Sequence, residues 1–190
     1  YVYWNEEEQC YDMLLASRIK GGGALRGGCI ALCRSEDLIH WSYEEPFYAP
    51  EMYITMECPE LFQMGDYWYL VFSTFSDQFT THYRIGKSPR GPWMIPEDDV
   101  FDTRSDYAIK TASDGKRRFA FGWIASKYGN CDFGPWEWGG TMVFHELIQN
   151  PDDGTLRVKV IPGVRDFYSE PQEEKKALAA GAKLQECAGG

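Results

Sequence analysis

Apolar residues fall in short runs, separated by turn-forming residues, along most of the chain. The clearest run, YWYLVFST at 67–74, is apolar at almost every position, which is typical of a strand buried on both faces. No apolar pattern of helical period lasts three turns before Glu173. The pattern therefore predicts an all-β chain, with strands at 1–4, 11–19, 28–35, 56–62, 67–74, 82–88, 106–111, 118–126, 141–148 and 156–161 and a short outer strand after Trp41.

These strands form three rounds of strand, tight turn, strand and strand. Aligning the second strands pairs Ser17 with Ser73 and Ser73 with Gly122, so the rounds repeat at intervals of 56 and 49 residues. A repeat of roughly fifty residues built from strands predicts β-propeller blades of four strands each. Because three blades fall short of the usual minimum of about four, we expect an arc of a propeller.

Two acids stand out within this repeat. Glu57 and Asp106 are also 49 residues apart, which predicts equivalent places on the innermost strands of successive blades, at the central channel. Glu57 lies between Met56 and Cys58, and Pro59 prevents a helix from running through it. A carboxyl held between soft apolar side chains is a candidate general acid. The alternative is an ordinary solvated glutamate.

Composition excludes several classes of partner. The formal net charge is -10, with acids spread along the chain, which argues against nucleic acid or an anionic membrane as a partner. No apolar run approaches the ~20 residues that span a bilayer. Aromatic residues make up 16% of the chain, and their flat faces suit the C–H faces of sugars as well as the core of a sheet.

Cysteine and histidine spacing predicts no metal site and no cofactor. The six cysteines include no C-x-x-C pair, and His40, His82 and His145 lie far apart. The glycine-rich loop at 21–23 lacks the Lys-Ser/Thr ending of a phosphate-binding loop, so we interpret it as a hairpin connection.

An ordered set of motifs is similar to a known family. The motifs are ECPELF at 57–62, DYA at 106–108, RRFAFGW at 117–123, WGGT at 138–141 and HEL at 145–147. Together they resemble glycoside hydrolase family 32, which contains invertases, levanases, inulinases and related β-fructofuranosidases. The resemblance covers nearly all of residues 1–165, which we therefore expect to be propeller blades. Residues 166–190 are expected to be a linker or the start of a further domain.

The resemblance implies a five-bladed propeller and a retaining glycosidase without a cofactor, acting on sucrose, fructo-oligosaccharides or fructans. It implies that Glu57 is the general acid/base and that Asp106 touches the sugar bound beyond the fructose. Trp123 matches an aromatic residue of the substrate pocket, and Tyr107 and Cys58 are further expected substrate-binding positions.

Two expected elements have no match. The nucleophilic aspartate of the family belongs to an Asn-Asp-Pro element, and a second aspartate, in an Arg-Asp-Pro element, holds fructose hydroxyls; neither triplet occurs here. We therefore expect that this chain alone does not hydrolyse fructosides. Lys110 stands where the family more often has glutamine, so a furanoside other than a fructoside stays open. The alternative function is a non-catalytic propeller that binds carbohydrate or protein.

Overall fold

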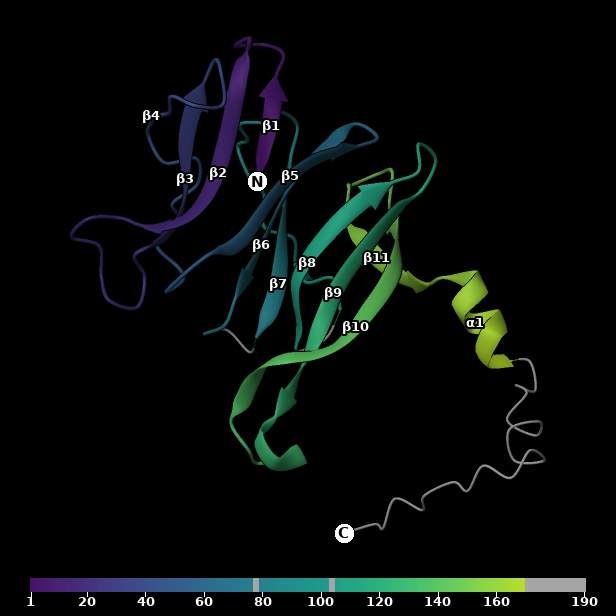
Figure 1. Ribbon diagram of the computed structural model, residues 1–190. Coiled ribbons are helices and arrows are strands. Elements are labelled where there is room, and N and C mark those ends of the chain that lie inside the picture. Colours follow the sequence, from purple (N-terminus) through teal and green to yellow (C-terminus); the bar gives the residue numbers. More distant parts are fainter. Residues whose placement is uncertain (77–78, 103–104, 170–190) are drawn as a thin grey trace. The chain divides into compact units, whose positions relative to one another are not determined.

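The structure of the chain is a computed structural model that describes residues 1–76, 79–102 and 105–169, and these residues are nearly all in strands and loops (Figure 1). The described elements are β1 (Val2–Asn5), β2 (Cys10–Arg18), β3 (Gly28–Ser35), β4 (Ser42–Tyr43), β5 (Glu57–Met64), β6 (Tyr67–Thr74), β7 (Thr80–Gly86), β8 (Asp106–Ser113), β9 (Arg118–Lys127), the short 3-10 helix η1 (Tyr128–Asn130), β10 (Trp136–Gln149), β11 (Leu156–Val160) and α1 (Pro162–Ser169). The predicted all-β class is confirmed.

The strands form three antiparallel sheets in chain order, β1-β2-β3-β4, β5-β6-β7 and β8-β9-β10-β11. These sheets are the three predicted rounds. In the middle sheet, the place of a fourth strand is taken by two isolated bridges, Ile85 to Met94 and His82 to Val100.

Apolar side chains fill the two junctions between neighbouring sheets. Leu14 of β2 and Leu32 of β3 pack with Phe72 of β6 in one cluster. Val71 of β6 packs with Ile109 of β8 and other residues of the third sheet in another. The middle sheet is therefore covered on both faces, which explains why the sequence of β6 is apolar at almost every position.

The first and third sheets each have one strand with exposed apolar side chains. Val2 and Trp4 alternate on β1, and Met142 and Phe144 alternate on β10, and all four are exposed. Alternating residues of a strand lie on one face. One face of β1 and one face of β10 therefore carry apolar side chains that the described residues leave open to solvent.

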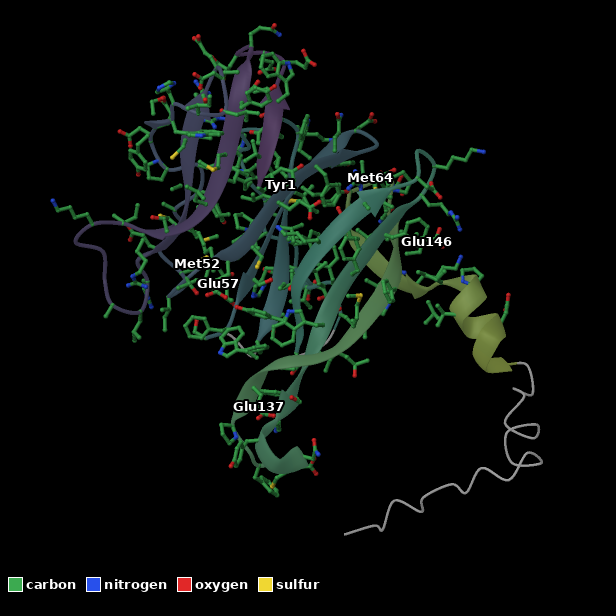
Figure 2. The ribbon with its side chains drawn as sticks, in the orientation of Figure 1. Tyr1, Met52, Glu57, Met64, Glu137 and Glu146 are labelled. Carbon is green, nitrogen blue, oxygen red and sulfur yellow. The ribbon has the colours of Figure 1, made fainter. Side chains whose placement is uncertain are left out.

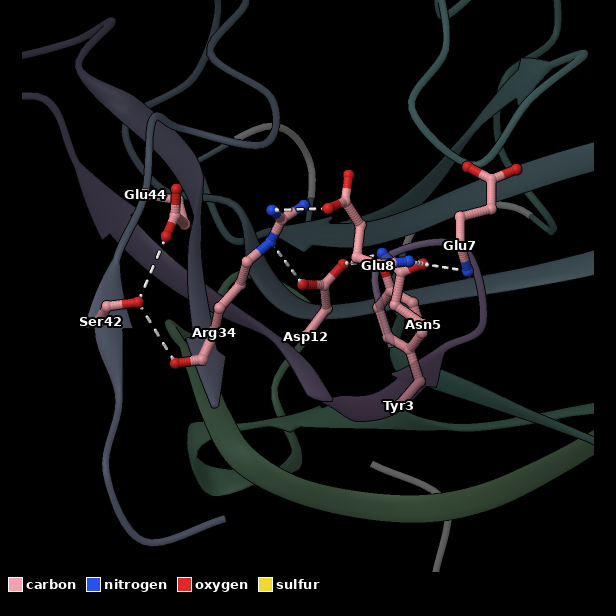
Figure 3. A network of polar contacts seen from close by, with 8 residues as sticks. All are labelled: Tyr3, Asn5, Glu7, Glu8, Asp12, Arg34, Ser42 and Glu44. Carbon is pink, nitrogen blue, oxygen red and sulfur yellow. Dashed lines mark hydrogen bonds and ion pairs between the residues drawn. The ribbon is translucent and has the colours of Figure 1, made fainter. Parts of the chain in front are cut away.

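A buried polar network joins the strands of the first sheet (Figure 3). Asp12 on β2 is fully buried, and its carboxylate accepts hydrogen bonds from Asn5 Nδ2 at 2.7 Å, Tyr3 OH at 3.1 Å and Arg34 Nε at 3.1 Å. Arg34 also lies 3.5 Å from a carboxylate oxygen of Glu8. Three donors satisfy the buried charge, as burial of a carboxylate requires.

The chain divides into two compact units, residues 1–159 and residues 160–190. In the second unit the described element is α1, which begins at Pro162, where the fixed φ of proline suits the first helical turn. The sequence did not predict this helix, because eight residues are too few for three turns of helical periodicity. The short helix or linker expected from Glu173 lies outside the described residues, and the boundary expected at 165/166 stays a prediction. Within the described ranges, no helix has the length and apolar character needed to cross a membrane.

The strand registers correct the predicted repeat by one residue. Glu57 pairs with Ser73, and Tyr107 pairs with Trp123, so the second and third sheets repeat at an interval of 50 residues rather than 49. A β-bulge follows each pair. The place equivalent to Glu57 is therefore held by Tyr107, and the expectation that Asp106 holds it is wrong. The all-apolar pattern of β6 carries no alternation, so it could not reveal a shift of one residue.

Candidate active site

Glu57 begins β5, in the half-buried position labelled in Figure 2. The hydroxyl of Tyr107, on β8 of the next sheet, donates a hydrogen bond of 2.5 Å to its Oε2. Burial, together with the hydrogen bond and the charge of Glu57, raises the pKa of Tyr107, so the phenol stays protonated and remains a donor. Among the described residues, no group donates a hydrogen bond to Oε1. Tyr107 therefore holds one carboxylate oxygen of Glu57, and the other oxygen has no donor in the described part of the chain.

Matching bulges shape the backbone beside Glu57 and beside Tyr107. Cys58 has a φ of 51° and Ala108 a φ of 54°, both left-handed. Lys110 Nζ donates to the carbonyl oxygens of Cys58, at 2.7 Å, and Pro59, at 2.8 Å. A bulge interrupts the ladder of hydrogen bonds, and the ammonium group of Lys110 supplies partners for these two carbonyls. The two sheets are thus joined directly beside Glu57.

Aromatic rings surround Tyr107. Phe79 stacks on its ring at a centroid distance of 4.2 Å, and Trp123 and Trp138 approach it edge-on at 5.6 and 5.8 Å. Trp123 and Glu57 thus contact the same tyrosine. A shared cavity for Trp123 and Glu57, and a contact of Trp123 with a sugar, stay predictions.

Asp106 lies on the opposite face of β8 from Tyr107, because adjacent strand residues face opposite sides of a sheet. Its side chain is 4% exposed, and it lies near His145 of β10 and Asp102 of the loop before β8. Burial, and secondarily the charge of Asp102, raises the pKa of Asp106 to about 7. A Cβ on Gly122 would lie 2.5 Å from Asp106 Oδ1, so this carboxyl fits only because position 122 is a glycine.

The sequence model described as the glycosyl hydrolases family 32 N-terminal domain matches residues 1–157. The chain belongs to glycoside hydrolase family 32. The predicted resemblance is confirmed.

Solved structures of family 32 enzymes share the fold. A β-fructofuranosidase from Bombyx mori matches with a TM-score of 0.64 at 19% identity, over 87% of this chain and 37% of that one. Fructan 1-exohydrolase IIa from Cichorium intybus matches with a TM-score of 0.61 at 14% identity, over 87% of this chain and 35% of that one. The three sheets of this family 32 chain are thus blades of a five-bladed propeller, as predicted. The chain spans little more than a third of the length of these relatives.

Sequence reasoning missed three features of the site. It selected Tyr107 as a substrate contact without foreseeing its hydrogen bond to Glu57, which a register correct to one residue would have indicated. It treated Lys110 only as a departure from the family. It did not connect Asp102 or His145 with Asp106, because these residues come from a loop and two strands and have no motif spacing.

Proposed function

We propose that this chain is part of a catalytic domain that hydrolyses β-fructofuranosides, such as sucrose or fructans, with Glu57 as general acid/base. The observation that supports this most directly is the hydrogen bond from Tyr107 to Glu57, the residue that the ECP motif suggests as the acid/base. A tyrosine that only donates orients the carboxyl and leaves Oε1 for proton transfer.

The proposed reaction has two steps. First, Glu57 gives its proton to the glycosidic oxygen, the bond from that oxygen to the anomeric carbon breaks, and a second carboxylate bonds to that carbon. Then Glu57 takes a proton from water, the water oxygen attacks the anomeric carbon, and the covalent bond to the enzyme breaks. Free fructose leaves, and Glu57 is protonated again.

The second carboxylate must lie ~5–5.5 Å from the first in a retaining enzyme. Neither an Asn-Asp-Pro nor an Arg-Asp-Pro triplet occurs in the sequence. Asp106 does not fit the role, because its carboxyl lies on the other face of β8 from the tyrosine that binds Glu57. We therefore propose that the nucleophile lies outside these 190 residues and that the chain alone has no appreciable activity.

Other residues have proposed roles in binding. Trp123 offers an aromatic face to the fructose ring, and Tyr107 and Cys58 border the same region. The expected contact of Asp106 with the sugar beyond the fructose has less support, because its carboxyl is 4% exposed and lies on the opposite face of β8 from Tyr107.

The test uses the complete protein that contains these residues. Glu57→Gln keeps the shape of the side chain and removes the transferable proton, so kcat for sucrose or a fructan should fall about 10²–10⁴-fold. Glu45→Gln, at an exposed position, is the matched control and should leave kcat unchanged. Equal activity of the Glu57→Gln variant and its parent would contradict the proposal. A protein that binds fructosides without hydrolysing them would favour the non-catalytic alternative.

A further inference from the structure

Asp102, Asp106 and His145 bring three potential metal ligands together behind the candidate active site. His145 Nε2 lies 3.1 Å from Asp102 Oδ2 and 3.9 Å from Asp106 Oδ2. One ligand atom from each residue can be chosen so that all three lie within 4.8 Å of one another. Two carboxylates and one imidazole thus converge from the loop before β8, from β8 and from β10.

The carboxylate of Asp106 has no hydrogen-bond partner among the described residues. Both of its oxygens are buried, and the whole side chain is 4% exposed and directed toward His145. An ionised carboxylate buried without a partner costs several kcal/mol. Asp12, the other deeply buried aspartate described above, accepts hydrogen bonds from three donors. The contrast indicates that a positive group belongs beside Asp106.

His145 also lacks hydrogen bonds in the described part of the chain. Both ring nitrogens are buried and neither has the geometry of a hydrogen bond there; Nε2 makes only the ion-pair contact with Asp102 at 3.1 Å, and the side chain is 16% exposed. A histidine that serves only to pack normally uses at least one ring nitrogen in a hydrogen bond. Its Nε2 instead points at the two aspartates.

The ligand set and its spacing suit a small divalent transition metal. Zn²⁺ bonds imidazole nitrogens and carboxylate oxygens at about 2.0–2.2 Å, which places the ligand atoms around one ion roughly 3–3.5 Å apart. His145 Nε2 lies 3.1 and 3.9 Å from the two carboxylates, and the three ligand atoms lie within 4.8 Å of one another, so side-chain rotations that draw them together would reach this geometry. Water would complete a tetrahedral set. Ca²⁺ and Mg²⁺ fit less well, because they prefer oxygen ligands alone.

We propose that Asp102, Asp106 and His145 bind one Zn²⁺ ion. The ion connects the start of β8 to β10 across the third sheet. One of its ligands, Asp106, is the residue directly before Tyr107. The ion therefore stabilises the strand that presents Tyr107 to Glu57 and takes no part in the chemistry. This inference does not depend on the proposed hydrolysis, and it departs from the sequence prediction of no metal site.

The experiment titrates Zn²⁺ into the metal-free protein by calorimetry and measures the melting temperature with and without the ion. We expect one ion per chain, a higher melting temperature in its presence, and at least about tenfold weaker binding in His145→Gln and in Asp106→Asn. Asp102→Asn, on a loop and with a side chain 35% exposed, provides a third variant if the buried ones do not fold. Mg²⁺ should neither bind nor compete.

The chain offers a matched control in a second aspartate–histidine pair. His40 Nδ1 lies 2.7 Å from Asp37 Oδ2, but both side chains are exposed, so His40→Gln should bind Zn²⁺ as the parent does. Cys131→Ser controls for the exposed thiol. Absence of binding would overturn the proposal. So would unchanged binding in His145→Gln and Asp102→Asn, or binding lost in either control.

Discussion

The hydroxyl of Tyr107 donates a 2.5 Å hydrogen bond to Oε2 of Glu57 across the junction between the second and third sheets. Each residue immediately precedes a bulge, in the same place on its own blade. The repeat of the propeller thus brings the carboxyl of Glu57 next to the hydroxyl of Tyr107, which stays protonated and donates the hydrogen bond. The candidate site is a property of two neighbouring blades rather than of one motif.

Removing the Tyr107 hydroxyl should impair catalysis while the fold is retained. A hydrogen bond to a charged group contributes about 1.5–3 kcal/mol, so Tyr107→Phe in the complete protein should lower kcat on the order of tenfold to a hundredfold. Tyr43→Phe, at an exposed tyrosine, should change nothing. Steady-state kinetics on sucrose provide the measurement. An unchanged kcat in Tyr107→Phe would show that the hydrogen bond does not orient the acid.

Lys110 should stabilise the bulge beside Glu57. Lys110→Met keeps most of the apolar stem and removes the two hydrogen bonds to the carbonyls of Cys58 and Pro59. We expect a loss of about 1–3 kcal/mol in the free energy of unfolding, measured by urea denaturation. Lys116→Met, in the exposed turn between β8 and β9, serves as the control. Equal stability of the two variants would contradict this role.

Gly122 should tolerate no side chain. A Cβ there would lie 2.5 Å from Asp106 Oδ1 and 2.9 Å from the carbonyl oxygen of Tyr107. Gly122→Ala should therefore lower the free energy of unfolding by about 1–3 kcal/mol and also weaken Zn²⁺ binding. Gly139→Ala, on exposed β10 with nothing within 4 Å, should change stability by no more than about 0.5 kcal/mol. If both variants unfold at the same urea concentration, the close packing of Asp106 on β9 is not important for stability.

The sequence predicted the fold class and most strands because turn residues separate short apolar runs. The bounds of β3 and β6 were predicted to the residue. β10 was predicted from residue 141 but begins at Trp136, because Gly139 and Gly140 interrupt the alternation that Trp136 and Trp138 begin. The one-residue error in the repeat has another origin: β6 is covered on both faces, so its all-apolar pattern fixes no register.

The candidate site was predictable only where the chemistry lies in a local motif. Glu57 and its neighbours are contiguous, so the motif identified them. Contacts that join blades, such as Tyr107 to Glu57 or Lys110 to Cys58, depend on the register between sheets. The grouping of Asp106 with His145 also depends on β9, which pairs with both β8 and β10. Gly122 of β9 leaves space for the carboxyl of Asp106.

The central claim, that Glu57 donates the proton to the leaving group, is tested most directly by varying that group. In the complete protein, kcat of Glu57→Gln relative to the parent should be compared for sucrose and for an aryl fructoside whose phenolate leaves without a proton. We predict a loss of orders of magnitude on sucrose and a much smaller loss on the aryl fructoside. Equal losses on both substrates would contradict the account.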